Sequence, residues 1–191
     1  MNQTQNIRNF FETNCPLSSE GIDELLVSFK RKTISKKNLI FNEGQYEKKI
    51  RFLNSGIIRE YYVNDVKESN INFYVKPMFV SDFNSFINQF PTKINQETLS
   101  DVEILELSKD KFYQLLEKYT CGKNIIDIAF QKLLKAKEIF EYNRITKEPK
   151  KVYEEIIQYN PDWLQLIPQY HIASYLGITP ETLSRIRNRR S

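Results

Sequence analysis

The sequence predicts an α+β protein with a β-rich first half, a long helix and a compact helical C-terminus. Three observations lead to this prediction. Between Thr33 and Leu107, short runs of β-branched and aromatic residues alternate with Asn, Asp and Gly. From Lys123 to Asn143, apolar residues recur at helical spacing. The segment from Gln169 to Arg190 has the pattern of two short helices joined by a glycine turn.

Composition sets the broad class. The chain has 191 residues, 40% of them hydrophobic, which suffices for one large domain or a medium and a small one. No apolar run is long enough to span a membrane, and residues 1–10 lack the apolar stretch of a signal peptide. Cys15 and Cys121 suit a reducing compartment, as small core residues rather than a disulfide. We therefore expect a cytoplasmic protein.

The first half is expected to begin with a helix at Leu17–Phe29 and to continue as strands. Gly44 and Gly56 lie in turn sequences, where a residue tolerant of positive φ is needed. Strands at this spacing predict a sandwich or a small barrel. The expected strands are Asn38–Phe41, Ile50–Leu53, Ile57–Val63, Ile71–Val75 and Val102–Leu107.

Helical patterns follow Leu107. Ser108 can cap a helix with Asp110 in its first turn, and the predicted buried face of that helix is Phe112, Leu115, Leu116 and Tyr119. The helix Lys123–Asn143 carries a seam at spacings of three and four. This seam would pair two chains in a homodimer, or it would be buried within one subunit. The seam residues are Ile126, Ala129, Leu133, Ala136 and Phe140.

The segment Lys147–Lys150 is polar and contains Pro149, which favours a domain boundary. A short amphipathic helix is expected at Val152–Tyr159. The chain then divides into a β domain with flanking helices at 1–120, a dimerisation helix at 121–146 and a helical domain at 147–191.

Positive charge gathers at the C-terminus. The whole chain carries +4, and the segment from Gln169 to Ser191 carries +3, with four arginines against Glu181. The rest of the chain therefore holds only +1. A basic tip on a near-neutral body is typical of a phosphate-facing surface, although a solvated tail has the same composition.

The same segment meets the packing needs of a helix-turn-helix. Ala173 is small where two helices must approach, and Gly177 can adopt the positive φ of a tight turn. Thr179 suits the N-cap of the second helix and Pro180 its first turn. The inward positions are all apolar: Ile172, Leu176, Ile178, Leu183 and Ile186.

The outward face of the second helix carries side chains that can read DNA. Arginine can bond guanine O6 and N7, glutamate can accept from cytosine N4, and hydroxyls suit bases or phosphates. Other arginines would meet the phosphate backbone. A polar αα-hairpin without DNA-binding function is the alternative. The candidate DNA-binding residues are Thr179, Glu181, Thr182, Ser184, Arg185, Arg187, Asn188, Arg189 and Arg190.

The stretch Ile172–Ile186 resembles the DNA-binding signature of the Crp/Fnr superfamily of transcription regulators. Lys37–Gly44 and Phe52–Arg59 resemble early strand-turn-strand segments of that family's β-roll. The resemblance covers most of the chain. It implies an N-terminal double-stranded β-helix or jelly roll of the cyclic-nucleotide-binding type, a long dimerisation helix and a C-terminal (winged) helix-turn-helix. It also implies that Glu181, Ser184 and Arg185 read bases and that Lys123–Asn143 pairs two subunits.

The effector segment departs from the family pattern. Cyclic-nucleotide binders of this fold have Gly-Glu, then Pro-Arg and a small residue, to hold phosphate and ribose. Here Ser81 replaces the glycine, Asp82 shortens the glutamate, and Thr92 and Lys93 follow Pro91 without an arginine. Lysine supplies charge but no bidentate fork. The effector-pocket candidates are therefore Ser81, Asp82, Thr92 and Lys93, and we do not expect a response to cyclic AMP.

No cofactor is expected, because a Cys₄ iron–sulfur cluster needs more thiols than two. The one histidine, His171, is predicted to be a surface or capping residue. The chain ends just past the second helix, so any wing is expected to be short or missing.

The expected function is a DNA-binding regulator, not an enzyme, because the chain has no HExxH, Walker A or GxSxG motif. The expected partners are palindromic duplex DNA, a second copy of the chain, an unidentified small effector and, by the resemblance, RNA polymerase; no membrane is expected. The alternative is a sensor that binds a cyclic nucleotide or another small ligand and whose C-terminal helices dock on protein.

Overall fold

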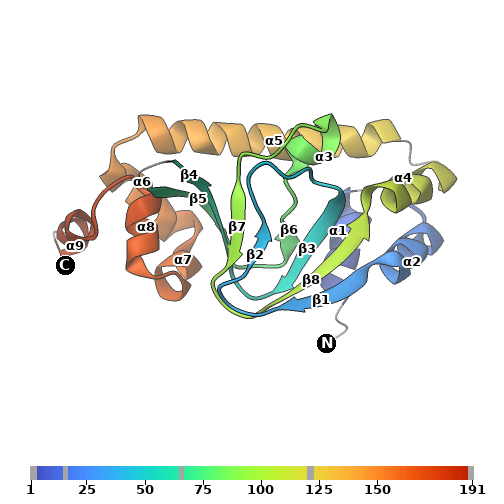
Figure 1. Ribbon diagram of the computed structural model, residues 1–191, viewed down its shortest axis with the longest axis horizontal. Helices are drawn as coiled ribbons and strands as arrows, with labels where there is room; N and C mark the ends of the chain where they lie inside the picture. The colour runs from blue at the N-terminus through green and yellow to red at the C-terminus, as the bar shows by residue number, and fades with distance from the viewer. Residues whose placement is uncertain (1–3, 15–16, 65–66, 120–122, 189–191) are drawn as a thin grey trace.

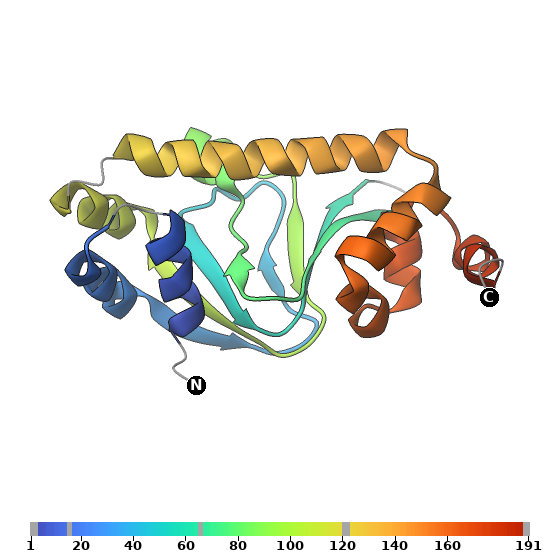
Figure 2. The ribbon, with the colours of Figure 1, turned by 180° about the vertical axis from the view of Figure 1, so that it is seen from behind.

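The protein is described by a computed structural model over residues 4–14, 17–64, 67–119 and 123–188. The helix α5 (Lys123–Thr146) runs along one side of the molecule, with the strands beside it (Figure 1). The helices α6 to α9 lie at one end of α5, and α2 and α4 lie at the other. Seen from behind, α1 packs on the β3–β6 side of the strands (Figure 2). No helix in these ranges has the length and apolar character needed to cross a bilayer.

The strands form two four-stranded antiparallel sheets, which together make a jelly-roll β-roll. One sheet has the order β1-β8-β3-β6 and the other β2-β7-β4-β5. Gly44 and Gly56 take positive φ at turns, as predicted. The strands are β1 Lys30–Ile34, β2 Leu39–Phe41, β3 Lys49–Ser55, β4 Ile58–Val63, β5 Glu68–Tyr74, β6 Met78–Phe79, β7 Asn95–Thr98 and β8 Val102–Ser108.

The predicted α+β architecture is confirmed, and the predicted strands and helices are all present within a few residues of their expected bounds. Sequence patterns missed α1, α3, α7, β1, β6 and β7. Between 147 and 188 the structure describes helices and no strand. The remaining helices are α1 Gln5–Asn14, α2 Ser19–Ser28, α3 Phe83–Asn88, α4 Lys109–Lys118, α6 Pro149–Tyr159, α7 Pro161–Leu166, α8 Gln169–Tyr175 and α9 Pro180–Asn188.

An aromatic core joins the first sheet to α1, α2 and α4. Phe79 on β6 makes edge contacts with Phe10, Phe11 and Phe52 at centroid distances of 4.6 to 5.8 Å. Ser108 caps α4 as predicted, its Oγ accepting from the backbone N–H of Lys111. This end of the molecule is held by apolar packing between β-roll and helices.

A second core is shared between the β-roll and the C-terminal helices. Phe73 on β5 packs edge-on against Trp163 of α7 at 5.0 Å and lies 6.0 Å from the ring of Tyr175 in α8. Neighbouring strand residues point to opposite faces of a sheet, so Tyr74 falls in the β-roll core instead. The helices after 147 therefore complete their apolar core with a residue from the β-roll.

Polar bonds fasten α8 to the same strand. The backbone N–H of Asn70 donates to Ser174 Oγ at 3.1 Å, and the Asn70 amide donates to His171 at both Nδ1 (3.2 Å) and the carbonyl oxygen (3.3 Å). The prediction of a surface or capping histidine is wrong: His171 is 7% exposed. Burial, with help from Arg59, lowers the pKa of His171 to about 4.

The long helix also contacts α8. Arg144 donates from Nη1 to the carbonyl oxygen of Tyr175 at 2.9 Å, and its guanidinium lies 5.3 Å from the centre of the Tyr175 ring. A cation near the C-terminus of a helix offsets the negative end of the helix dipole. The C-terminal helices are thus bonded to both β5 and α5.

Several predicted features fall outside the described part of the chain. These are Cys15, Cys121, Arg189 and Arg190. The backbone of α5 is described throughout, but the side chains of the five seam residues are not. Pairing of two chains through Ile126, Ala129, Leu133, Ala136 and Phe140 stays a prediction.

Replacing Phe73 by alanine should lower the free energy of unfolding by about 3–5 kcal/mol, because it empties the centre of the shared core. Urea denaturation followed by far-UV circular dichroism measures this loss. Phe90→Ala is the control, since Phe90 is 61% exposed and its removal should cost little. Equal losses in the two variants would contradict a core centred on Phe73.

The stability of the chain should depend on His171 below pH 6.5. In the unfolded chain the imidazole is protonated near pH 6.5, whereas in the folded chain it stays neutral to about pH 4. The unfolded state thus binds more protons between these values, so stability falls as the pH drops, by up to about 1.4 kcal/mol per pH unit.

The comparison variant is His171→Asn, which keeps an acceptor for the Asn70 amide but does not titrate. Its free energy of unfolding, measured by denaturant titration from pH 7.5 to pH 4.5, should fall less steeply than that of the parent. Parallel curves for the two proteins would show that His171 is not the group responsible.

Candidate nucleic-acid interface and ligand cleft

The turn between α8 and α9 has the local features that the sequence predicted for it. Gly177 has φ +69°, a conformation that residues with a Cβ rarely adopt. The N–H of Ile178 donates to the carbonyl of Ala173 at 3.0 Å, and Ala173 is buried where the two helices approach. The turn therefore fixes the direction in which α9 leaves α8.

The start of α9 is capped by a threonine. Thr179 Oγ1 accepts from the N–H of Thr182 at 3.3 Å, and Pro180 is the first helical residue. Glu181 lies in the first turn, where its own backbone N–H and the Thr179 hydroxyl lower the pKa of its carboxyl group. A charged glutamate at this helix start is thus favoured at neutral pH.

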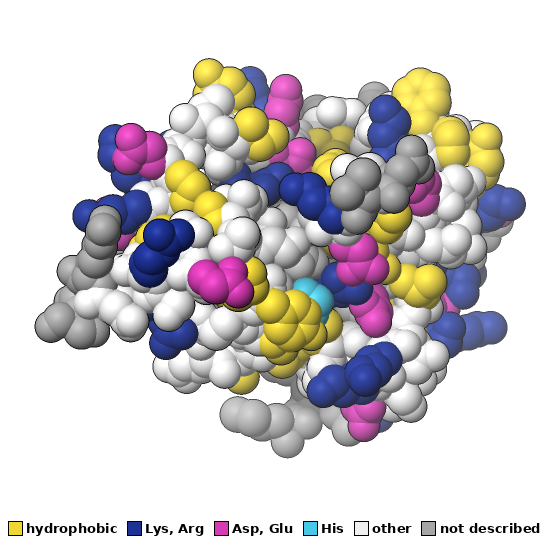
Figure 3. All heavy atoms as spheres, turned by 60° about the vertical axis from the view of Figure 1, so that its left-hand side comes forward, with side chains coloured by type: hydrophobic (Ala, Val, Ile, Leu, Met, Phe, Trp, Pro, Cys, Tyr) yellow, Lys and Arg dark blue, Asp and Glu magenta, His cyan; other side chains and the backbone are white. Residues whose placement is uncertain are grey.

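One face of α9 is buried and the other is open. Leu183 is buried in the shared core and Ile186 is half-buried against it. Thr182 is half-buried, and its Oγ1 already accepts from Nη2 of Arg185 at 3.0 Å. Figure 3 shows this end of the molecule, with basic side chains spread over the surface and acidic ones between them. The candidates that are exposed are Thr179, Glu181, Ser184, Arg185, Arg187 and Asn188.

A further basic residue lies beside these candidates. Lys150, in the first turn of α6, lines a small cleft of about 280 Å³ together with Thr182, Arg185 and Ile186. In the sequence, Lys150 belongs to the polar segment that predicts a domain boundary, and no binding role was expected of it. The sequence feature that could have pointed to a basic surface here is the pair Lys150-Lys151, which follows the proline at the start of a helix.

The loop at the predicted effector segment satisfies its own polar groups. Asp82 Oδ1 accepts from the N–H groups of Asn84 and Ser85 at the start of α3, and Thr92 donates to Asp82 Oδ2 at 2.6 Å. Ser81 is buried, and its Oγ accepts from the N–H of Arg51 at 2.6 Å. The N–H groups of Asn84 and Ser85 at the start of α3 are thus already paired with a carboxylate of the chain.

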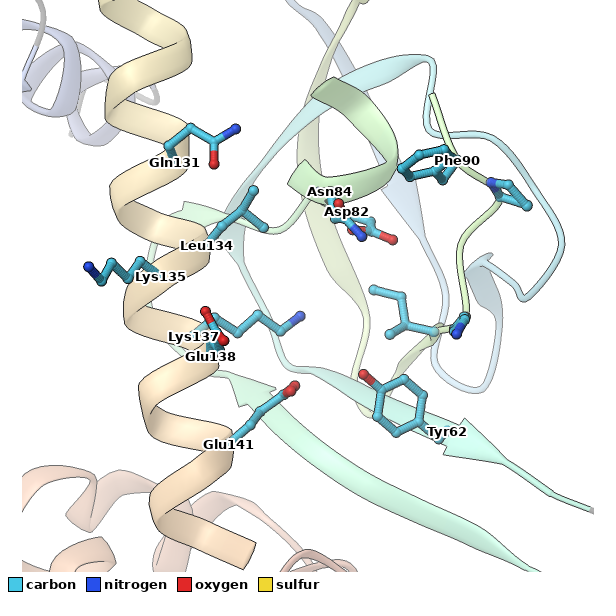
Figure 4. Close-up of a pocket in the computed structure, with 13 residues that line it drawn as sticks. Tyr62, Asp82, Asn84, Phe90, Gln131, Leu134, Lys135, Lys137, Glu138 and Glu141 are labelled. Atoms are coloured by element: carbon cyan, nitrogen blue, oxygen red, sulfur yellow. Dashed lines mark hydrogen bonds between the residues drawn. The ribbon is translucent and has the colours of Figure 1, made fainter. Parts of the chain in front are cut away.

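A cleft of about 930 Å³ lies between this loop and α5. Of the four predicted effector residues, Asp82 and Lys93 line it, whereas Thr92 is buried and Ser81 faces a second, apolar pocket of about 400 Å³. In Figure 4, Tyr62, Lys137 and Glu141 point into the space between the β-roll and α5, and Lys135 points away from it. The cleft is therefore bounded by two elements that are distant in the sequence.

Behind the cleft lies a buried polar group that the sequence analysis missed. Glu60 on β4 is fully buried, and Lys137 of α5 bonds to its Oε1. Tyr74 donates to Glu60 Oε2 at 2.5 Å and Gln96 to the same oxygen at 3.2 Å. No pattern in the sequence links Glu60 to Lys137, which is 77 positions away.

Within the described ranges, no three His, Cys, Asp or Glu side chains are grouped so that they could hold a metal ion. The chemistry available in the cleft is that of carboxylates, amines, two amides and a phenol. These groups bind by charge and hydrogen bonding.

Comparisons with known proteins match the β-roll and the overall fold. Residues 31–119 match the cyclic nucleotide-binding domain family. The c-di-GMP responsive global regulator CLP of Xanthomonas campestris aligns with a TM-score of 0.70 and 15% identity, over 90% of this chain and 91% of its own. A CooA mutant from Carboxydothermus hydrogenoformans aligns with a TM-score of 0.67 and 17% identity, over 87% and 78%. FixK2 from Bradyrhizobium japonicum aligns with a TM-score of 0.68 and 12% identity, over 84% and 83%.

No curated protein matches the sequence. The alignments to these solved structures cover 84 to 90% of this chain, which is more than the β-roll at residues 31–119 alone. Residues 31–119 are thus similar to a cyclic nucleotide-binding domain, and the chain has the fold of CLP, CooA and FixK2.

Proposed function

We propose that this protein is a sequence-specific DNA-binding transcription regulator of the Crp/Fnr type that does not respond to cyclic AMP. The observation that carries the proposal is the geometry of α9. A fixed turn at Gly177 presents a helix whose buried side is held by Leu183 and whose open side carries Glu181 and Arg185. A helix of this kind fits the major groove of duplex DNA.

The proposal assigns different roles to the exposed residues. Glu181, Ser184 and Arg185 read base edges, while Thr179, Arg187 and Asn188 contact the backbone, together with Arg189 and Arg190. Thr182 supports Arg185 through its hydroxyl. Lys150 adds a cation at the edge of the same surface.

The rest of the chain fits a regulator that works as a homodimer. In this proposal residues 1–120 sense an effector, 121–146 pair two subunits, and 147–191 bind DNA. Two recognition helices related by a two-fold axis would enter successive major grooves of a palindromic operator. RNA polymerase is the expected partner if the regulator activates transcription. Such a role belongs in the cytoplasm.

Selection of binding sites from a random duplex pool should enrich an inverted repeat whose half-sites are about one helical turn apart. Arg185→Ala should then lose about 1–3 kcal/mol of binding and lose discrimination at one base position, because one bidentate contact is removed. Fluorescence anisotropy on the selected operator and on single-base variants measures both effects.

Arg187→Ala is the matched control on the same helix. It should weaken binding to all sequences alike and reduce the slope of affinity against salt by about one, as expected for a phosphate contact. A pool that yields no enriched sequence would refute the proposed function. Loss of base discrimination in Arg187→Ala, with none in Arg185→Ala, would refute the assignment of roles.

Calorimetric titration with cyclic AMP should give no binding up to millimolar nucleotide. The physical reason is that Asp82 already occupies the N–H groups of α3 and its negative charge repels phosphate. The double variant Asp82→Gly, Thr92→Arg is the comparison, since it removes the carboxylate and supplies a guanidinium. Micromolar affinity of the parent chain would contradict this account of the loop.

A further inference from the structure

The interior of the β-roll is built around a buried carboxylate. Glu60 lies on β4, in register with Asn72 of β5 and Gln96 of β7, and it is fully buried. An isolated carboxylate in such a place is strongly unfavourable unless a positive group and hydrogen-bond donors compensate it. Tyr74 and Gln96 both donate to Oε2, which leaves Oε1 facing a cation.

That cation comes from a different element, on the cleft side. The ammonium group of Lys137 reaches Glu60 Oε1 from α5, and the Lys137 side chain is 32% exposed along the cleft while Glu60 is 1% exposed. Burial opposes the charge of Lys137, but Glu60 and Tyr74 more than offset this and raise the pKa of its amine. The Lys137 side chain thus places its ammonium group against the Glu60 carboxylate, the position that the ammonium group of a bound alkylamine would take.

Two further acceptors lie in this region. Glu141 Oε1 and Gln96 Oε1 are buried and have no hydrogen-bond donor among the described residues. Glu141 lies one helical turn beyond Lys137 and points into the same space (Figure 4). Burial raises the pKa of the Glu141 carboxyl, which indicates that this carboxylate is incompletely compensated.

The charges around the cleft favour a cation over an anion. Three acids, Asp82, Glu138 and Glu141, line the cleft, and of its lysines Lys135 points away from it (Figure 4). Lys137 is paired with Glu60 behind the wall, so the acids of the cleft are opposed only by Lys93. Among the residues that the structure describes, no arginine lines the cleft, and Asp82 already accepts from the N–H groups at the N-terminus of α3.

We propose that the β-roll interior is a receptor for a primary ammonium group, that Lys137 is its resident occupant, and that a ligand bearing an alkylamine competes with Lys137 for Glu60. The effector class is therefore an aliphatic amine. This inference does not depend on DNA binding, because its tests measure the protein and the amine alone.

Displacing Lys137 would act on the C-terminal helices through α5. Lys137, Glu141 and Arg144 follow one another at spacings of four and three, on the face of α5 that meets the rest of the chain. Arg144 bonds to the last carbonyl of α8. A ligand that separates α5 from Glu60 would therefore alter the helix that holds α8 in place.

The test is chemical rescue of Lys137→Ala. Propylamine supplies the four atoms that this substitution removes beyond Cβ, including the ammonium nitrogen. Its addition at ten times its dissociation constant should raise the Tm of the variant by about 4 °C. The parent chain and Lys135→Ala should show a much smaller rise, because in both the amine must displace Lys137, and Lys135 points away from the cleft.

Propan-1-ol and propionate, at matched ionic strength, are the ligand controls, and Glu60→Gln, Lys137→Ala is the protein control. Rescue by the amine alone, abolished in the double variant, would support the proposal. Equal stabilisation by the alcohol or the anion, or an unchanged effect in the double variant, would overturn it. Absence of any rescue would show that Glu60 and Lys137 form a structural ion pair only.

A second measurement covers the case in which Lys137→Ala does not fold. Calorimetry of 1,5-diaminopentane with the parent chain should show binding, and Glu60→Gln should weaken it at least about tenfold. No binding to the parent chain, or equal binding to both proteins, would overturn the proposal. Failure of operator binding would leave these results unaffected, so the two proposals can fail separately.

Discussion

The strand β5 imposes the constraint on which the rest of the structure depends, because it belongs to two cores at once. The alternation of side chains along a strand sends Tyr74 into the β-roll and Phe73 into the C-terminal helices. Asn70 on the same strand donates hydrogen bonds to His171 and Ser174 of α8. The position of α9 therefore follows from the register of β5, and a one-residue slip would lose all of these contacts.

This arrangement places the contacts that support α8 and the interior of the β-roll on opposite faces of one sheet. Arg59 on β4 faces the side of His171, where it bonds to Glu68 and Glu97, while the next residue, Glu60, faces α5. Adjacent residues of one strand thus contribute to the support of α8 and to the lining of the β-roll. A shift of the strands that line the β-roll interior would therefore act directly on the contacts that hold α8, the helix before α9.

The features predicted from the sequence are those with a periodic or local cause. The strand at Val102–Leu107 and the turn at Gly177 follow from side-chain alternation and positive φ, and both were found. The strand β1 was missed because Lys30–Ile34 is mostly exposed and charged, so it shows no apolar alternation. The helix α7 is only six residues long and lies between prolines, which in the sequence reads as a turn.

The sites divide in the same way. The face of α9 could be predicted because one helix supplies it, and Asp82 because it stands within a short motif. Glu60 and Lys137 could not, since their association depends on how α5 lies across the β-roll. His171 was placed on the surface because its partner, Asn70, is 101 positions away in the chain. Long-range polar contacts leave no local signal in a single sequence.

The bond between Thr92 and Asp82 has a consequence for how such a loop could change in evolution. If Thr92 alone became arginine, its guanidinium would lie beside the Asp82 carboxylate and pair with it. The positive charge of the arginine would then be compensated within the chain and would not be available to a phosphate. If Asp82 were replaced first, the N–H groups at the start of α3 would lose their cap and become accessible. An arginine introduced later at position 92 could then pair with a bound anion. The order of the two substitutions therefore decides whether the loop gains a guanidinium that is free to pair with an anion.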